Sequence, residues 1–77
     1  MEDLLEFLAR ALVENPDKVS VEGFDEDDGT IVLEVHVAED DLGKIIGRGG
    51  RTVSSLRTVM RAVASRNDER VLVDIVE

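Results

Sequence analysis

The chain has 77 residues and a formal net charge of −9, and it contains no cysteine, tryptophan or tyrosine. A chain of this length forms one small domain, so we expect a single domain over residues 1–77. The lack of cysteine excludes disulfides and thiolate chemistry. Two phenylalanines cannot supply the aromatic platforms on which many single-strand-binding proteins stack bases. No apolar run reaches the length of a signal peptide or membrane span, so we expect a cytoplasmic protein without membrane association.

The negative total conceals a strong segregation of charge along the chain. Residues 1–42 carry 14 acids and 2 bases, and residues 67–77 carry 4 acids and 1 base. Residues 43–66 between them carry no acid and six bases, a net charge of +6. Because phosphate binding is driven by positive charge, this central window is the part of the chain that could bind a polyanion.

The first half of the chain is predicted to form one helix and a hairpin. Residues 2–14 have apolar side chains at helical spacing and acids in the first turns. Asn15-Pro16 ends this helix, and strands are predicted at 18–24 and 30–37. The acidic segment 25–29 joins them and ends in Asp-Gly, which is typical of a hairpin turn. The apolar face of the helix is predicted to comprise Leu4, Leu5, Leu8, Ala11 and Leu12.

The second half is predicted to contain two helices and a last strand. A short helix covers residues 39–46, a glycine-rich turn at 47–50 ends it, and a longer helix follows at 52–65. Residues 71–76 alternate as a strand. The order helix, strand, strand, helix, helix, strand predicts an α+β fold in which helices cover one face of a three-stranded sheet.

The turn Gly47-Arg48-Gly49-Gly50 has more glycine than a corner between helices requires. One glycine at the end of the first helix is enough for a positive φ, and each further glycine loses entropy on folding. A bare backbone at a helix N-terminus, next to arginines, is a site for phosphate. The turn is therefore the candidate functional site.

Two phosphate-binding motifs do not fit this turn. A Walker A motif requires glycine five residues before Gly50, where the chain has Ile45. The dinucleotide-binding pattern requires glycine at position 52, which is Thr52. Both also require a strand before the loop, and here a helix is predicted, so nucleotide binding is not favoured.

The segment Ile45-Ile46-Gly47-Arg48-Gly49-Gly50-Arg51-Thr52-Val53 resembles the signature of the KH (K-homology) domain. That signature is an apolar pair, then G-x-x-G, then an apolar residue three positions on. The predicted element order resembles the type II, prokaryotic arrangement, and the resemblance covers nearly the whole chain. The chain is also similar to the small single-KH bacterial proteins of the KhpA/YlqC family. This similarity rests on the short length, on residues 41–47, and on residues 50–52 followed by Leu56-Arg57.

The resemblance implies binding of single-stranded RNA, in which the G-x-x-G loop clamps about four nucleotides by their backbone. Gly47 and Gly50 would form the turn, Arg48 and Gly49 would touch phosphate, and aliphatic side chains would line a groove under the bases. It also implies a mixed sheet with one parallel strand pair. The implied RNA-binding residues are Lys44, Ile46, Gly47, Arg48, Gly49, Gly50, Arg51, Val53 and Arg57.

The resemblance further implies a small bacterial RNA chaperone or post-transcriptional regulator. The family is described as forming homodimers and as pairing with a second KH-containing protein, so a homodimer or such a heterodimer is expected. Gly49 stands where a polar or basic residue is common, which predicts modest affinity. The acidic turn 25–29 corresponds to the variable loop that borders the groove in many KH domains, and it either repels RNA or points away.

Two other functions are weighed against RNA binding. The net charge of −9 and the single arginine inside the loop favour a protein-interaction or dimerisation module in which RNA contact is secondary. An enzyme is not favoured, because Asp40 and Asp41 are adjacent and no nucleophile–base pair is recognisable. No cofactor or metal site is expected: His36 is interpreted as an exposed strand residue, since there is no cysteine and no second histidine.

Overall fold

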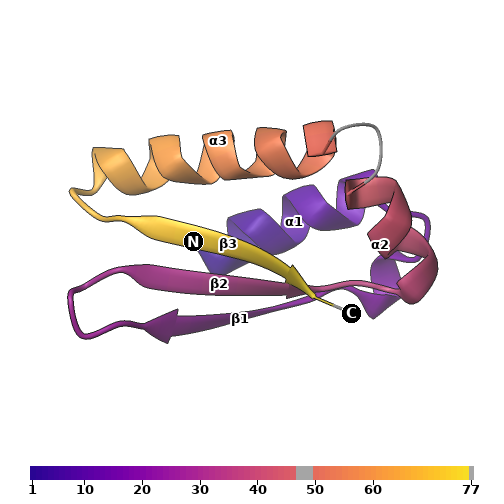
Figure 1. The fold of residues 1–77 in the computed structure, drawn as a ribbon, viewed down its shortest axis with the longest axis horizontal. Helices are drawn as coiled ribbons and strands as arrows, with labels where there is room; N and C mark the ends of the chain where they lie inside the picture. The colour runs from indigo at the N-terminus through magenta and orange to yellow at the C-terminus, as the bar shows by residue number, and fades with distance from the viewer. Residues whose placement is uncertain (47–49, 77) are drawn as a thin grey trace.

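We describe the fold from a computed structural model, which covers residues 1–46 and 50–76. The predicted element order is confirmed, with one short 3₁₀ turn added. Figure 1 shows the helices and strands along the chain. The elements are α1 (Glu2–Leu12), η1 (Pro16–Lys18), β1 (Ser20–Asp25), β2 (Ile31–His36), α2 (Glu39–Ile46), α3 (Arg51–Arg66) and β3 (Val71–Val76).

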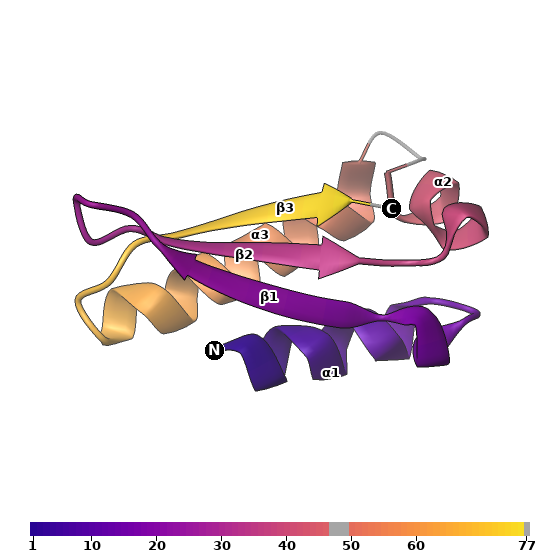
Figure 2. The same cartoon turned by 90° about the horizontal axis from the view of Figure 1, so that it is seen from below.

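The three strands form one mixed sheet in the order β1-β2-β3. β1 and β2 are antiparallel, with Glu22 opposite Glu34. β2 and β3 are parallel, with Ile31 opposite Val71, which confirms the expected parallel pair. α1 and α3 lie side by side on one face of the sheet, and none of the helices in residues 1–46 and 50–76 covers the other face (Figures 1 and 2). The fold is therefore a two-layer α+β sandwich.

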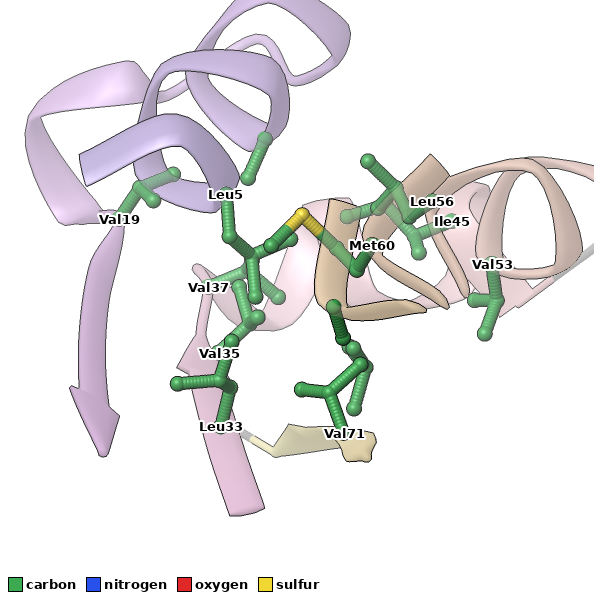
Figure 3. Close-up of a cluster of buried hydrophobic side chains, with 13 residues drawn as sticks. Leu5, Val19, Leu33, Val35, Val37, Ile45, Val53, Leu56, Met60 and Val71 are labelled. Carbon is green, nitrogen blue, oxygen red and sulfur yellow. The ribbon is translucent and has the colours of Figure 1, made fainter. Parts of the chain in front are cut away.

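The core lies between this sheet and the helices. Leu5 of α1 and Met60 of α3 meet over Leu33 and Val35 of β2 (Figure 3), and all four side chains are fully enclosed. Ile45 brings α2 into the same cluster. Burying a Leu, Ile or Met side chain stabilises the fold by about 1.5–3 kcal/mol, so these contacts hold both layers together.

The first helix differs from its prediction in length and in its buried face. α1 ends at Leu12 rather than at residue 14, because Val13 is already extended (φ −112°, ψ 163°). Leu5 and Ala9 are the buried residues of α1. Three residues of the predicted stripe, Leu4, Ala11 and Leu12, are exposed. The core-facing side is thus narrower than the apolar pattern suggested, and apolar side chains remain on the surface of the helix.

The other boundaries shift by one or two residues. The first strand begins at Ser20 instead of residue 18, because Pro16–Lys18 form the 3₁₀ turn. β2 is one residue shorter at each end than predicted, and α3 is one residue longer at each end. α2 and β3 have their predicted bounds. Within the described residues, no helix has the length and apolar character that crossing a membrane requires.

Candidate nucleic-acid interface

A groove lies where the end of α2, the start of α3 and the end of β3 come together. α2 packs against α3, and α3 packs along β3, so these three elements share one end of the molecule (Figure 1). Four of the predicted RNA-binding residues line the groove, and β3 supplies most of the others. The lining residues are Ile46, Gly50, Val53, Ser54, Arg57, Asp74, Ile75 and Val76.

Gly50 is the described part of the glycine turn, and its conformation explains why it is glycine. Its φ of 72° lies in the left-handed region, where a side chain is strained. Apart from its neighbours in the chain, no atom of the described residues lies within 4 Å of the position where its β-carbon would be. The groove is therefore open beside the backbone of Gly50, at the N-terminus of α3. Gly47, Arg48 and Gly49 lie outside the described residues.

The surface of the groove is mainly aliphatic. Val53 is buried beneath it, Ile75 and Val76 are half-buried, and Ile46 exposes about half of its side chain (52%). Helix α2 thus presents an exposed isoleucine toward a floor formed by α3 and β3. Aliphatic surface of this kind can pack against the faces of bases without an aromatic residue.

Arg57 provides positive charge on the β3 side of the groove. Its Nε donates a hydrogen bond to the backbone oxygen of Val73, at 3.1 Å, which fixes the guanidinium against the edge strand. Arg61, one helical turn further on, lines the next depression along the same edge, together with Arg57 and residues 71–74. A phosphate backbone following α3 from Gly50 would therefore meet two arginines in succession.

Lys44 and Arg51 are not among the residues that line the groove. Lys44 Nζ is 2.6 Å from the Glu14 carboxylate, which belongs to the segment after α1. This hydrogen bond raises the pKa of Lys44 above its ordinary value. Arg51 is the exposed first residue of α3. The structure therefore places these two predicted bases around the groove rather than in it.

Asp41 positions the helix that leads to the glycine turn. Its side chain is fully enclosed, and its carboxylate accepts hydrogen bonds from the backbone N–H groups of Glu14 (2.9 Å) and Asn15 (3.1 Å) and from the Asn15 amide (3.0 Å). These bonds, the one from Glu14 above all, hold the pKa of Asp41 below its ordinary value. They also occupy the backbone that would have continued α1, which explains why that helix ends early.

The acidic hairpin lies at the opposite end of the sheet from α2 (Figure 1). Residues 26–28 line a separate depression with Thr30 and Leu72. Asp28 accepts a hydrogen bond from the backbone N–H of Thr30 (2.9 Å) and pairs with Arg70 (3.2 Å). Of the two sequence alternatives, the described structure agrees with an acidic turn directed away from the groove.

The contribution of β3 to the groove is not evident from the sequence. Ser54 follows Val53 directly and was within reach of prediction, since its helix position adjoins the glycine turn. Asp74, Ile75 and Val76 are more than 20 residues beyond the turn in the sequence. Only the parallel pairing of β2 and β3 brings them to this end of the molecule, and no short-range pattern in the sequence shows that pairing.

The order α-β-β-α-α-β and the three-stranded mixed sheet with one parallel pair define a type II KH domain. The family model described as the KhpA/KhpB KH domain matches residues 2–75 of the chain. The chain therefore belongs to the KhpA/KhpB KH-domain family.

Relatives from several bacteria agree with this assignment. A Clostridium acetobutylicum protein is 42% identical over 99% of this chain and 100% of its own length. A Streptomyces coelicolor protein is 48% identical over 97% of this chain and 94% of its own length. A Mycobacterium tuberculosis protein is 47% identical over 97% of this chain and 89% of its own length. Each is named RNA-binding protein KhpA, and the family is not one of enzymes, as the sequence predicted.

Proposed function

We propose that this protein binds single-stranded RNA in the groove between α2, α3 and β3. The observation that carries the proposal is the combination of an open left-handed Gly50, an aliphatic floor and a fixed Arg57 in one groove. The names of the relatives support it, since they describe RNA-binding proteins. We further propose, from the family resemblance, that the domain spans residues 1–77 and acts in the cytoplasm as an RNA chaperone or post-transcriptional regulator.

In this proposal the sugar–phosphate backbone passes the glycine turn, where Arg48 and Gly49 contact phosphate. The bases then lie over Val53, Ile75 and Ile46, and the following phosphates approach Arg57 and Arg61. The aliphatic floor gives little base discrimination, because it offers contact area without a fixed set of hydrogen-bonding groups. Asp74 is the acidic member of the lining and would keep phosphates toward the α3 side of the groove.

Fluorescence anisotropy of a labelled, mixed-sequence single-stranded RNA tests the proposal. Arg48→Asp with Gly49→Asp places two carboxylates at the loop and leaves Gly47 and Gly50 to form the turn. The matched control is Ser65→Asp with Arg66→Asp, an equal change of charge at the far end of α3. We expect the wild type and the control to bind and the loop variant, still folded by circular dichroism, to lose binding. With about three phosphates neutralised, log K should fall with log salt at a slope near −2.

Other outcomes would redirect the proposal. Equal binding by the wild type and the loop variant would move the contact to the Arg57–Arg61 side of α3. Equal loss in both double variants would show that net charge alone drives association. If the wild type fails to bind at low salt, RNA contact by the isolated chain is excluded, and a protein-interaction module becomes the better account.

We also propose that the protein pairs, either with a second copy or with another KH-containing protein. The surface of α1 supports this, because Phe7 is 69% exposed and Leu4 and Leu12 are also exposed. Asp3, Glu6 and Arg10 surround Phe7 with charges of both signs, a composition that suits a second copy of the same helix. Light scattering should report a dimer for the wild type and a monomer for Phe7→Glu, and a monomeric wild type would exclude the homodimer.

A further inference from the structure

The open face of the sheet holds a group of side chains that RNA binding does not use. Antiparallel pairing sets Glu22 of β1 directly opposite Glu34 of β2, and His36 lies two residues further along β2 on the same face. The ligand atoms of all three lie within 4.8 Å of one another. None of them lines the groove. We propose that Glu22, Glu34 and His36 form a binding site for a divalent transition-metal ion such as Zn²⁺.

The imidazole is directed at the two carboxylates. His36 Nε2 is 3.8 Å from Glu34 Oε1 and 3.9 Å from Glu22 Oε1. Both distances exceed hydrogen-bond length. Nε2 exposes less than 1 Å² to solvent and has no hydrogen-bond partner among the residues that the structure describes. A buried polar atom in this situation requires an explanation, and a coordinated cation supplies one.

The two distances from the imidazole nitrogen are close to those of tetrahedral coordination. Zinc binds imidazole nitrogen and carboxylate oxygen at about 2.0–2.2 Å, so neighbouring ligands of a tetrahedral ion are about 3.3–3.6 Å apart. The observed separations of 3.8 and 3.9 Å become suitable after movements of about half an ångström. The side chains of Glu22, which is exposed, and Glu34, which is half-buried, can make such movements by rotation about their side-chain bonds, without any change in the sheet.

The chemistry of the ligands selects the class of metal. One nitrogen and two carboxylates suit Zn²⁺ and its neighbours, whereas Mg²⁺ and Ca²⁺ prefer ligand sets made only of oxygen. Three protein ligands leave a fourth position for water or for a group on a partner. A cation would also offset the repulsion between Glu22 and Glu34, since like charges directly opposite in a sheet are destabilising. Asp74 is opposite Glu34 in the parallel register and adds further negative potential.

The sequence predicted no metal site at His36, because the chain has no cysteine and no second histidine. A single histidine binds a metal weakly by itself. The strand register changes this assessment, because it adds one carboxylate from each of two strands to that histidine.

Calorimetric titration of the protein, freed of any histidine tag, with ZnCl₂ at pH 7.5 tests the site. His36 is the only histidine, so its imidazole gives a single set of nuclear magnetic resonance signals on which coordination is read directly. We expect one Zn²⁺ per chain and a shift of the His36 signals. Glu22→Gln and His36→Ala each remove a direct ligand, so each should weaken binding at least as much as the loss of an outer-shell partner does, by about 10-fold or more. Glu26→Gln, with the same change of charge in the same hairpin, should leave the affinity unchanged.

Several results would overturn the site. One is the absence of a His36 shift up to millimolar Zn²⁺. Another is equal weakening by Glu22→Gln and Glu26→Gln, which would indicate diffuse attraction to acidic residues. A third is displacement of Zn²⁺ by an equal concentration of Mg²⁺. RNA affinity should be the same for Glu22→Gln and wild type, so this proposal and the RNA-binding proposal fail independently.

Discussion

Each end of the molecule is held by one aspartate that accepts backbone hydrogen bonds, yet the two aspartates work over different distances. Asp28, in the acidic hairpin, binds the N–H of Thr30 two residues on and is largely exposed. Asp41, in the first turn of α2, is fully enclosed and binds backbone 26 and 27 residues away. The first aspartate shapes a turn. The second connects α1 to the helix that carries the candidate RNA-binding groove.

The two ends of the molecule also differ in the charged residues that they carry. The end held by Asp41 carries the groove, with Arg57 on its β3 side. The end held by Asp28 carries a run of acids that lines a different depression. The run of acids in the hairpin therefore lies away from the groove, although Asp74 contributes one acid to the groove lining.

The largest effect is expected for Asp41→Asn. The amide retains one acceptor oxygen, but its NH₂ group faces donors from Asn15, so buried hydrogen bonds are lost without any change of volume. We expect the melting temperature to fall by roughly 10 °C, measured by circular dichroism. RNA affinity should fall as well, because α2 loses its fixed position.

Asp28→Asn is the matched control for this change. Asparagine is also favoured in turns, and the site is exposed, so a shift of no more than about 2 °C is expected. Equal shifts for the two variants would contradict the distinction between a long-range link and a local turn.

A second prediction concerns which arginines contact RNA. Arg57→Gln removes the charge in the groove but keeps a donor for the backbone oxygen of Val73. Arg70→Gln makes the same change at the hairpin end, where Arg70 pairs with Asp28. We expect about a 3- to 10-fold loss of RNA affinity for the first variant and almost none for the second. Similar losses in anisotropy titrations would show that RNA does not distinguish the two ends.

The smallest effect is a pH dependence of stability in the acid range. Hydrogen bonds hold the pKa values of Asp41 and Asp28 below the ordinary value of about 3.9. Their stabilising contribution is therefore complete above about pH 5 and is lost as the pH falls through 3.9 and then through the lower folded-state values. Urea unfolding from pH 6 to pH 2.5 measures this loss. Asp41→Asn should flatten the profile more than Asp28→Asn, and an unchanged slope in Asp41→Asn would contradict the assignment.

Local patterns in the sequence were sufficient for most of the fold. Asp-Gly at 28–29 marked the hairpin, alternation marked β3 with its observed bounds, and acids marked the start of α2. The predicted end of α1 was wrong, because the observed end depends on hydrogen bonds to Asp41 that form only in the folded chain. The apolar stripe of α1 was right for Leu5 and Leu8 but too wide, because periodicity does not show how wide a face the neighbouring sheet can cover.

The candidate site was predictable to the extent that it is local. Ile46, Gly50, Val53 and Arg57 lie within twelve residues, and the structure brings all four to one groove. Three other features depend on contacts between distant segments of the chain. They are the position of Lys44 next to Glu14, the groove lining from β3, and the approach of Glu22 and Glu34 to His36. Composition and spacing carry no information on which segments will meet.

The groove is formed by the two helices that connect the parallel strands β2 and β3, and by β3 itself, which is the last of these elements to be synthesised. α2 and α3 are made before β3, but β3 forms part of the floor and one side of the groove. A nascent chain that has reached only α3 can contain both helices and the glycine turn, but it has no groove. The growing protein therefore cannot present the complete candidate interface until β3 has emerged from the ribosome and paired with β2.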